Sequence, residues 1–141
     1  MTRGTLLLLC LWLTACGGGG GGGSTTPTTP APAPTPPATE NFSGTVAAYG
    51  YTFHTYTPTR AGTATITLTW SAGVDLDLYV TGSACTGYPP DQCTIVARSV
   101  SSTGTEEKVT LTVQAGVALR LWIDNFSPST PASYSVTASV P

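Results

Sequence analysis

Apolar and polar residues alternate with a period of two over several segments of the chain after residue 60. Residues 63–70, 108–113 and 133–140 show the pattern most clearly, with threonine and serine at most of the polar positions. A period of two puts successive side chains on opposite faces of a β-strand, so each segment predicts a strand with one buried face. The side chains expected to point inward are Ala64, Ile66, Leu68, Trp70, Val109, Leu111, Val113, Tyr134, Val136, Ala138 and Val140.

Four further segments predict strands, although their alternation is shorter or less regular. Residues 75–81 and 117–125 carry apolar side chains at every second position, and residues 94–99 form a weaker candidate. Near residues 45–57, three aromatic side chains share one face and are expected in the core. No stretch shows the period of a helix. The inward side chains are Leu76, Leu78, Val80, Val117, Leu119, Leu121 and Ile123, and the early aromatics are Tyr49, Tyr51 and Phe53.

Seven or eight strands of this kind indicate the fold class. Each strand has one apolar face and one face of threonine and serine. The apolar faces are buried when two antiparallel sheets pack against each other, and the threonine and serine faces remain in solvent. Glycines fall between the strands, where turns need their backbone freedom. The sequence therefore predicts an all-β, antiparallel β-sandwich in one domain at residues 40–141.

The chain begins with the features of a bacterial export signal. Arg3 gives a positive start, and an apolar run from Leu6 to Leu13 follows, which is too short to span a bilayer. The run closes with Leu-Thr-Ala-Cys at residues 13–16, which resembles the lipobox of a bacterial lipoprotein. A buried N-terminal helix is the alternative, but the glycine run 17–23 would leave it nothing to pack against.

The lipobox resemblance implies a processed and lipidated protein. Residues 1–15 would be removed as a signal peptide, and Cys16 would carry the lipid that makes the membrane a partner of this chain. Several acyl chains make such an anchor stable, at roughly 0.8 kcal/mol per buried methylene. Similar Gram-negative lipoproteins that stay in the inner membrane have Asp after the cysteine, whereas this chain has Gly17. We expect a lipid-anchored place in the bacterial cell envelope, at the outer membrane if the source is Gram-negative.

Residues 16–39 predict a linker. After Cys16 the segment contains only glycine, serine, threonine, proline and alanine, which offer little apolar surface to offset the entropy of ordering the chain. The glycine run favours a flexible coil, and the proline-rich part favours an extended polyproline II conformation. The sequence therefore predicts a disordered N-terminal region before the sandwich.

The charge of the chain is low and slightly acidic. Seven aspartate and glutamate residues stand against five lysine and arginine residues, which gives a formal net charge of −2. Nucleic acid is bound through basic surfaces that neutralise its phosphates, and anionic lipid attracts polybasic segments. The composition therefore argues against nucleic acid as a partner.

Four short motifs resemble the bacterial pre-peptidase C-terminal domain. They are Val-Asp-Leu-Asp-Leu-Tyr-Val at 74–80, Glu-Glu at 106–107, Ala-Gly at 115–116 and Tyr-Ser-Val at 134–136. The resemblance implies a jelly-roll β-sandwich of a type usually appended to exported enzymes, and similar domains bind collagen or polysaccharide, some with calcium. That family usually has an aromatic pair after Ala-Gly, whereas this chain has Val-Ala-Leu at 117–119. We expect the module to stand alone on its anchor.

Two of the four cysteines remain for the folded domain once Cys10 leaves with the signal peptide and Cys16 is lipidated. In an exported protein, Cys85 and Cys93 are expected to form a disulfide across the turn-rich loop between them. A metal site is the alternative, but two thiolates without a companion histidine or further cysteine make a poor zinc shell.

Acidic residues raise the question of a calcium site. Two aspartates lie two residues apart on a predicted strand, so their carboxylates share a face and repel, and a calcium ion is one solution. The alternative is that one accepts backbone hydrogen bonds and the other is solvated. Glycoside hydrolysis needs two carboxylates across a cleft, which adjacent positions on one strand do not provide. The candidate calcium ligands are Asp75, Asp77, Glu106, Glu107 and Asp124.

Trp122 falls on the polar face of its predicted strand, with Arg120 and Asp124. An aromatic ring on such a face suggests a ligand contact, and a flat ring beside hydrogen-bonding groups suits stacking on a sugar. The alternatives are that the other sheet or the linker covers Trp122, or that a bulge shifts the face. Tyr88, in the loop that the disulfide would close, is a further candidate contact, as is Arg120.

No catalytic constellation stands out from the sequence. His54 is the only histidine and is expected to be exposed, and no serine lies in a Gly-x-Ser-x-Gly elbow. We therefore predict no catalytic residues, no enzyme activity and no cofactor beyond the calcium considered above. The leading interpretation is an envelope lipoprotein with a binding or accessory module for a polysaccharide or a protein. The alternative is a structural or assembly lipoprotein that holds a protein partner through a sheet edge.

Overall fold

The computed structural model describes residues 33, 35–87 and 92–141. One compact unit spans Pro34–Pro141. No α-helix occurs among the described residues, so none there is long and apolar enough to cross a membrane. The strands are β1 (Ala38–Val46), β2 (Tyr51–Tyr56), β3 (Gly62–Trp70), β4 (Leu76–Gly82), β5 (Ile95–Ser99), β6 (Glu106–Val113), β7 (Leu119–Asn125) and β8 (Ala132–Val140).

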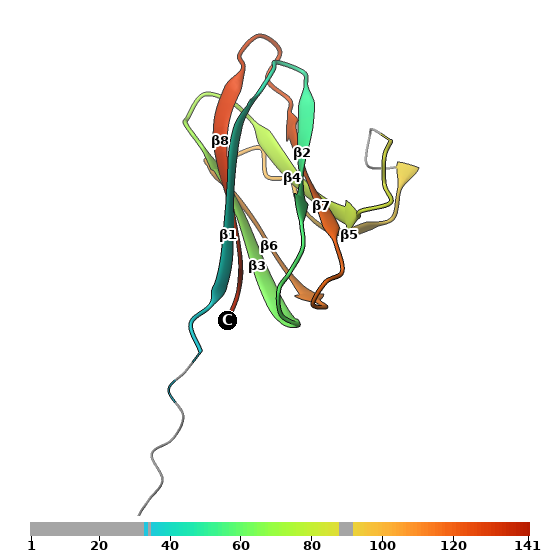
Figure 1. Cartoon of the computed structure of the whole chain (residues 1–141). Helices are drawn as coiled ribbons and strands as arrows, with labels where there is room; N and C mark the ends of the chain where they lie inside the picture. The colour runs from blue at the N-terminus through green and yellow to red at the C-terminus, as the bar shows by residue number, and fades with distance from the viewer. Residues whose placement is uncertain (1–32, 34, 88–91) are drawn as a thin grey trace, which may run out of the picture. The chain divides into compact units, whose positions relative to one another are not determined.

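The strands form two four-stranded antiparallel sheets. The first sheet has the order β1-β8-β3-β6, and the second has the order β2-β7-β4-β5. The two sheets pack face to face (Figure 1). Strands from opposite ends of the domain pair with each other, β1 with β8 and β2 with β7, which is the arrangement of a jelly roll. The predicted all-β, antiparallel sandwich is confirmed.

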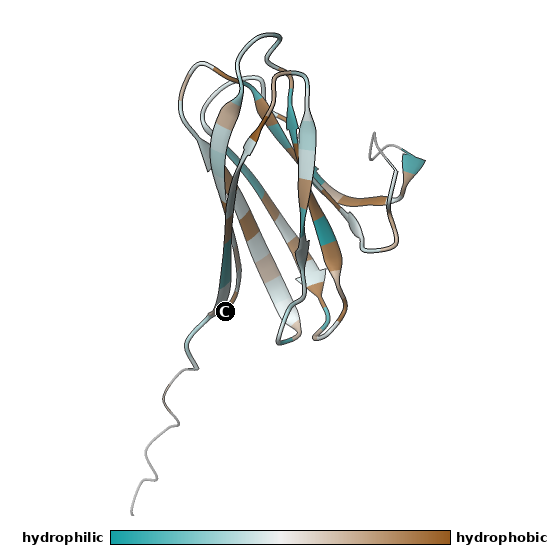
Figure 2. Ribbon diagram, turned by 45° about the horizontal axis from the view of Figure 1, so that its top comes forward, coloured by the Kyte–Doolittle hydropathy of each residue, from teal (hydrophilic) through white to brown (hydrophobic). Residues whose placement is uncertain are grey.

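The core lies between the sheets, where the alternation predicts it. All the predicted inward residues of β3, β4 and β8 are buried, and hydrophobic and hydrophilic positions alternate along the strands (Figure 2). The weaker candidate near residues 94–99 is confirmed as β5. The expectation for Val117 is wrong, because this residue lies in the turn before β7 and is exposed. Leu111 and Leu119 are only partly buried.

The single strand predicted near residues 45–57 is two strands. A turn at residues 47–50 separates β1 from β2, and the Gly50 amide donates a hydrogen bond to the Ala47 carbonyl across 3.0 Å. β1 begins at Ala38, inside the segment predicted as linker, because its backbone pairs with the end of β8. Backbone pairing therefore orders a stretch whose side chains gave no strand signal.

The early aromatic residues were expected in the core, and this expectation is wrong. Tyr51 and Phe53 point outward from β2, while His54 and Tyr56 take the inward positions. Tyr49 lies in the turn with a left-handed backbone (φ 49°) and is 71% exposed. Both faces of β2 carry aromatic side chains, so the alternation alone did not reveal which face is buried.

The predicted disulfide between Cys85 and Cys93 is confirmed, with 2.08 Å between the sulfur atoms and 5.7 Å between the Cα atoms. It closes the loop between β4 and β5. Tyr88 belongs to residues 88–91 of this loop, which lie outside the described residues. The predicted signal peptide, Cys16 and residues 16–32 of the linker also lie outside them.

Candidate functional site

The outer face of the second sheet gathers aromatic and charged side chains from neighbouring strands. Directly paired residues of an antiparallel sheet lie on the same face. The register pairs Phe53 with Trp122, Trp122 with Tyr79, and Tyr79 with Arg98, so these four form a row across the sheet. Arg120 lies on the same face in the next row. We call Tyr51, Phe53, Tyr79, Arg120 and Trp122 the aromatic face.

Trp122 lies at the centre of the aromatic face, but it is buried. Its indole ring lies 5.0 Å from the Phe53 ring and 6.1 Å from the Tyr51 ring, centroid to centroid, and only 1% of the residue is exposed. The indole N–H donates a 3.0 Å hydrogen bond to the Thr81 hydroxyl. The predicted face of Trp122 is right, but its predicted role as an exposed ligand contact is wrong. Among the described residues, Phe53 and Tyr51 of β2 and Arg120 of β7 lie against its ring.

Arg120 lies against the rings of Phe53 and Trp122. Its guanidinium carbon lies 4.3 Å from the centroid of Phe53 and 5.9 Å from that of Trp122. A guanidinium over an aromatic ring is attracted by the ring's quadrupole. Arg120 therefore makes a cation–π contact with Phe53 within the aromatic face. Its role as a ligand contact stays a prediction.

The rings that reach solvent lie along β2. Tyr51 is 49% exposed and Phe53 is 41% exposed, and Tyr49 and Phe126 add exposed rings where β2 begins and β7 ends. Alternate residues of a strand stand about 6.6 Å apart. Tyr51 and Phe53 pack against the buried ring of Trp122. Exposed apolar groups in such number on one face are typical of an interaction site.

A pair of carboxylates lies at one end of the aromatic face. Asp77 of β4 is paired with Asp124 of β7, and both residues are buried. The Tyr79 hydroxyl donates a 3.0 Å hydrogen bond to Asp77 Oδ2. Burial, together with the nearby carboxylates Asp75, Glu107 and Asp124, raises the pKa of Asp77 to about 6, even though the Tyr79 hydrogen bond acts in the opposite direction.

The other candidate calcium ligands differ in their hydrogen bonds and exposure, although Asp75 and Glu107 lie near enough to Asp77 to raise its pKa. Glu106 is exposed, whereas Glu107 is buried and accepts hydrogen bonds from the Ser99 hydroxyl and from the Ser101 amide, the latter at 2.6 Å. The Asp75 amide donates to the Ser127 hydroxyl.

The five predicted calcium ligands are thus not brought together. Among the described residues, no group of three or more histidine, cysteine, aspartate or glutamate side chains is placed to hold a metal ion. Of the five, only Asp77 and Asp124 face each other directly across paired strands. The described residues therefore give the five-ligand set no ready-made metal site, and calcium binding stays a prediction. The members of that set are Asp75, Asp77, Glu106, Glu107 and Asp124.

His54 is half-buried, contrary to the expectation that it is exposed. Its ring stacks on Phe42 of the first sheet, with 4.9 Å between centroids, and its Nε2 lies 2.9 Å from the Tyr134 hydroxyl. Burial lowers the pKa of His54. These contacts join the two sheets, so the histidine has a structural role.

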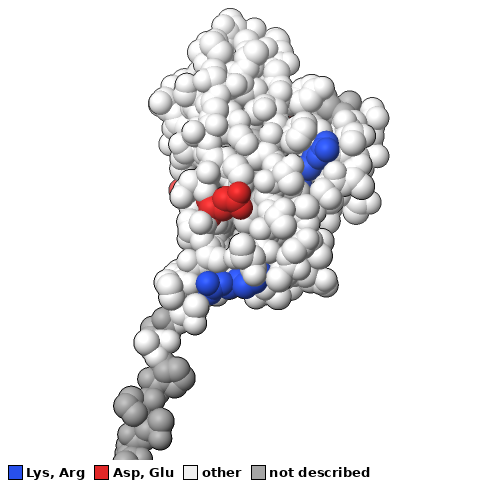
Figure 3. Space-filling view, viewed as in Figure 1, with Lys and Arg blue, Asp and Glu red and all other residues white. Residues whose placement is uncertain are grey.

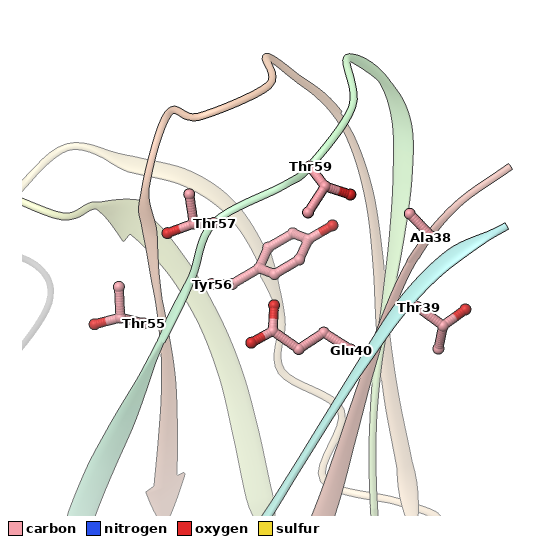
Figure 4. Close-up of a pocket in the computed structure, with 7 residues that line it drawn as sticks. All are labelled: Ala38, Thr39, Glu40, Thr55, Tyr56, Thr57 and Thr59. Atoms are coloured by element: carbon pink, nitrogen blue, oxygen red, sulfur yellow. The ribbon is translucent and has the colours of Figure 1, made fainter.

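An open groove separates β1 from β2 at one end of the sandwich. It has a volume of about 510 Å³ and is lined by residues of both strands and of the turn after β2. Glu40 and Tyr56 point into it from opposite sides (Figure 4). Charged side chains are few and scattered on the surface seen in Figure 3. The lining residues are Ala38, Thr39, Glu40, Thr55, Tyr56, Thr57 and Thr59.

No protein-family model matches the chain. No curated protein sequence matches it either. Similarity is found among solved structures. A mitogen derived from Yersinia pseudotuberculosis (YPM) has 18% sequence identity and a TM-score of 0.53, over 74% of this chain and 87% of that chain.

Two further structures have the same fold. The pre-peptidase C-terminal domain of a Bacillus anthracis collagenase has 10% identity and a TM-score of 0.53, over 70% of this chain and 87% of that chain. PliG of Aeromonas hydrophila, a periplasmic inhibitor of g-type lysozyme, has 13% identity and a TM-score of 0.51, over 73% and 86%.

These similarities define the class of the domain as a jelly-roll β-sandwich module. The resemblance to the pre-peptidase C-terminal domain is supported at the level of the fold, because one of the similar structures is such a domain. The three similar structures are a mitogen, a pre-peptidase C-terminal domain and a lysozyme inhibitor. Identities of 10–18% show the shared fold alone.

Proposed function

We propose that this chain is a cell-envelope lipoprotein without enzyme activity, and that its sandwich binds a polysaccharide on the aromatic face. The observation that carries the proposal is the row of exposed rings formed by Tyr51 and Phe53 above the buried Trp122. Flat rings held in place by a rigid layer suit stacking on the apolar faces of sugars, because little conformational entropy is lost on binding.

The chemistry around the rings fits a neutral ligand with many hydroxyl groups. Arg98 and Arg120 lie on the same face as Asp77 and Asp124, and Asp75 lies close to Asp77, so the face carries charges of both signs. Such a face offers donors and acceptors for sugar hydroxyls and no excess of positive charge to attract an anionic polymer. A protein ligand is the competing outcome, and the experiment below distinguishes the two.

The test is binding of the full chain to insoluble cellulose, chitin, purified peptidoglycan and, as a protein probe, collagen. The wild type should be depleted from solution by at least one of the polysaccharides. Phe53→Ala and Tyr51→Ala should each weaken that binding about tenfold, because an aromatic contact contributes about 1 kcal/mol beyond its buried area. The measurement is the dissociation constant from depletion isotherms.

Val117→Ala is the matched control, since Val117 is an exposed apolar residue in the turn before β7 and lies outside the aromatic face. It should bind like the wild type. Depletion by collagen alone would point to a protein ligand, and polysaccharide binding that both ring substitutions leave intact would overturn the role of the aromatic face.

A further inference from the structure

The groove between β1 and β2 is a part of the surface that the proposed function does not use. β1 is an edge of the first sheet and β2 is an edge of the second, and each pairs with a neighbour on one side only. The groove has a volume of about 510 Å³. Sites for small molecules commonly have volumes of about 300–1,000 Å³. The groove is therefore large enough for a small polar molecule.

Glu40 occupies a core-facing position of β1. It pairs directly with Ala138 of β8, which is fully buried, and directly paired residues of antiparallel strands lie on the same face. Phe42 and Val46, the next large side chains on this face of β1, are apolar. Glu40 nevertheless remains exposed, because the groove opens at this end of the sandwich. Its carboxylate therefore points into the groove and keeps contact with solvent (Figure 4).

Tyr56 and Thr59 form the opposite wall of the groove, at the end of β2 and in the turn that follows it (Figure 4). Burial and the charge of Glu40 raise the pKa of Tyr56, so its phenol stays neutral and its oxygen can accept a hydrogen bond. The hydroxyl group of Thr59 can accept one as well. The polar side chains that face the groove thus carry three kinds of oxygen atom, and one of them is negatively charged.

No cationic side chain balances this charge within the groove. None of the described residues that line it is a lysine or an arginine. Arg60 follows Thr59 in the sequence but is not part of the lining, and Arg120 lies over Phe53 on the outer face of the second sheet. A primary ammonium group donates three hydrogen bonds and accepts none. It therefore complements the carboxylate and the hydroxyl oxygens of the groove in both charge and hydrogen bonding.

Backbone groups form much of the remaining lining. The side chains of Thr39, Thr55 and Thr57 point away from the groove in Figure 4, so these residues reach it through their backbone. Because β1 and β2 are edge strands, that backbone offers N–H donors and carbonyl acceptors. Sugar hydroxyl groups both donate and accept hydrogen bonds, whereas a lysine side chain carries its ammonium group on an apolar stem. The lining therefore favours an amino sugar over a lysine side chain.

We propose that the groove between β1 and β2 binds an amino sugar through its unacylated ammonium group, which the Glu40 carboxylate and the hydroxyl groups of Tyr56 and Thr59 hold. The sugar hydroxyls bind the backbone of the two edge strands. This site is separate from the aromatic face, so the proposal does not rest on the function proposed above. N-acetylated sugars are rejected, because acetylation removes the positive charge and leaves the amide nitrogen with one N–H donor in place of three.

The first test titrates the full chain in detergent with four small probes and measures dissociation constants from NMR chemical shifts. D-glucosamine should bind at least about tenfold more tightly than N-acetyl-D-glucosamine or D-glucose, since a hydrogen bond to a charged group is worth about that factor. Added salt should weaken glucosamine binding by screening. Equal affinity for the two amino derivatives, or tighter binding of the lysine probe Nα-acetyllysine amide, would overturn the assignment.

The second test locates the bound ammonium group by substitution. Glu40→Gln should weaken glucosamine binding at least about tenfold and Tyr56→Phe about fivefold, as expected for one charged and one neutral hydrogen bond. Glu106→Gln is the matched control, because Glu106 is an exposed carboxylate on the opposite edge of the first sheet. It should bind glucosamine like the wild type and share the melting temperature of Glu40→Gln.

Phe53→Ala separates this site from the aromatic face. It should leave the preference for glucosamine over N-acetylglucosamine unchanged, whatever its effect on polysaccharide binding. If Phe53→Ala removes that preference, or if Glu40→Gln binds glucosamine as tightly as the wild type, the ammonium site is not in the groove. A wild type that binds no glucosamine would also overturn the proposal and leave Glu40 as a charge that keeps the β1 edge from pairing with other chains.

Discussion

At the scale of single residues, Trp122 explains how a polar sheet face can contain a large buried ring. Its neighbours Phe53 and Tyr51 cover it, Arg120 lies over Phe53, and its N–H is satisfied by Thr81. Because the indole N–H keeps a hydrogen bond, burial of the apolar ring stabilises the domain without the cost of an unpaired donor. Trp122 therefore supports the face without touching solvent.

Replacing Trp122 with alanine should destabilise the domain. The change removes a fully buried aromatic side chain and leaves the Thr81 hydroxyl without its donor, so the expected loss is about 3–5 kcal/mol of unfolding free energy. Urea denaturation measures it. Val117→Ala is the control and should change stability by less than about 0.5 kcal/mol, as expected for an exposed position. A loss of similar size in both variants would contradict the role given to Trp122.

Asp77 makes stability depend on pH. Its folded pKa of about 6 lies above the ordinary value of 3.8, so between these values the folded state binds the proton more tightly than the unfolded state. The resulting contribution to the free energy of unfolding is fully present below about pH 4 and is lost as pH rises through 6. The full shift corresponds to about 3 kcal/mol, and solvent screening of this half-buried carboxyl lowers the contribution to about 2 kcal/mol.

Asp77→Asn should remove that dependence. Asparagine is neutral and can still accept the Tyr79 hydrogen bond, so the variant should gain stability over the wild type at pH 7.5 and match it near pH 4. Thermal melts across this range measure the difference. Glu106→Gln, at an exposed carboxylate, is the control; a pH profile of Asp77→Asn parallel to that of the wild type would refute the assignment.

At the scale of elements, the loop between β4 and β5 is held by one covalent link. Cys85 and Cys93 are eight residues apart and close the loop where β4 ends and β5 begins. The strand pairing there also changes register between Val80 and Thr81. Because β5 is a short edge strand, we expect its position to depend on this link.

Replacing both cysteines by alanine should lower the unfolding free energy by about 2.5 kcal/mol, since the open loop gains entropy in the unfolded chain. Denaturation in urea measures the change. Reduction of the wild type with dithiothreitol should give the same shift and leave the double variant unaffected. Equal stability of the oxidised wild type and the double variant would show that the link does not constrain the unfolded chain.

β2 is the element that sequence patterns described least well. Its six residues place aromatic rings on both faces, so periodicity found the strand region but assigned Tyr51 and Phe53 to the core. Only its pairing with β7 settles the question, because β7 has a clear inward face with Leu121 and Ile123. In contrast, β3 and β8 were predicted residue by residue.

At the scale of the whole molecule, the two ends of the described chain lie at one end of the sandwich. Ala38 at the start of β1 pairs with Val140 at the end of β8. The turn at residues 47–50 lies at the opposite end, with the segment after β7 (Figure 1). The chain therefore enters the sandwich at Ala38, which also lines the groove.

The proposed anchor makes a direct prediction. With a lipid on Cys16, the full chain expressed in a bacterium should partition into the detergent phase and the membrane fraction, since acyl chains supply the binding energy. Cys16→Ser should move it to the aqueous phase, as measured by immunoblot of fractionated cells. Cys10→Ser is the matched control and should leave the chain in the membrane. A chain that stays membrane-bound after Cys16→Ser would contradict lipidation at this residue.

The sequence by itself determined the fold class, most of the core and the disulfide. Alternating side chains and two closely spaced cysteines are local signals, and the tertiary packing agrees with them. The tertiary structure decided which face of β2 is buried and that Trp122 is covered. It also decided that, among the described residues, no three of the five carboxylates are placed to hold one metal ion. These are questions of which strands become neighbours. Strand pairing joins residues as distant as Phe53 and Trp122, and no local pattern specifies that choice.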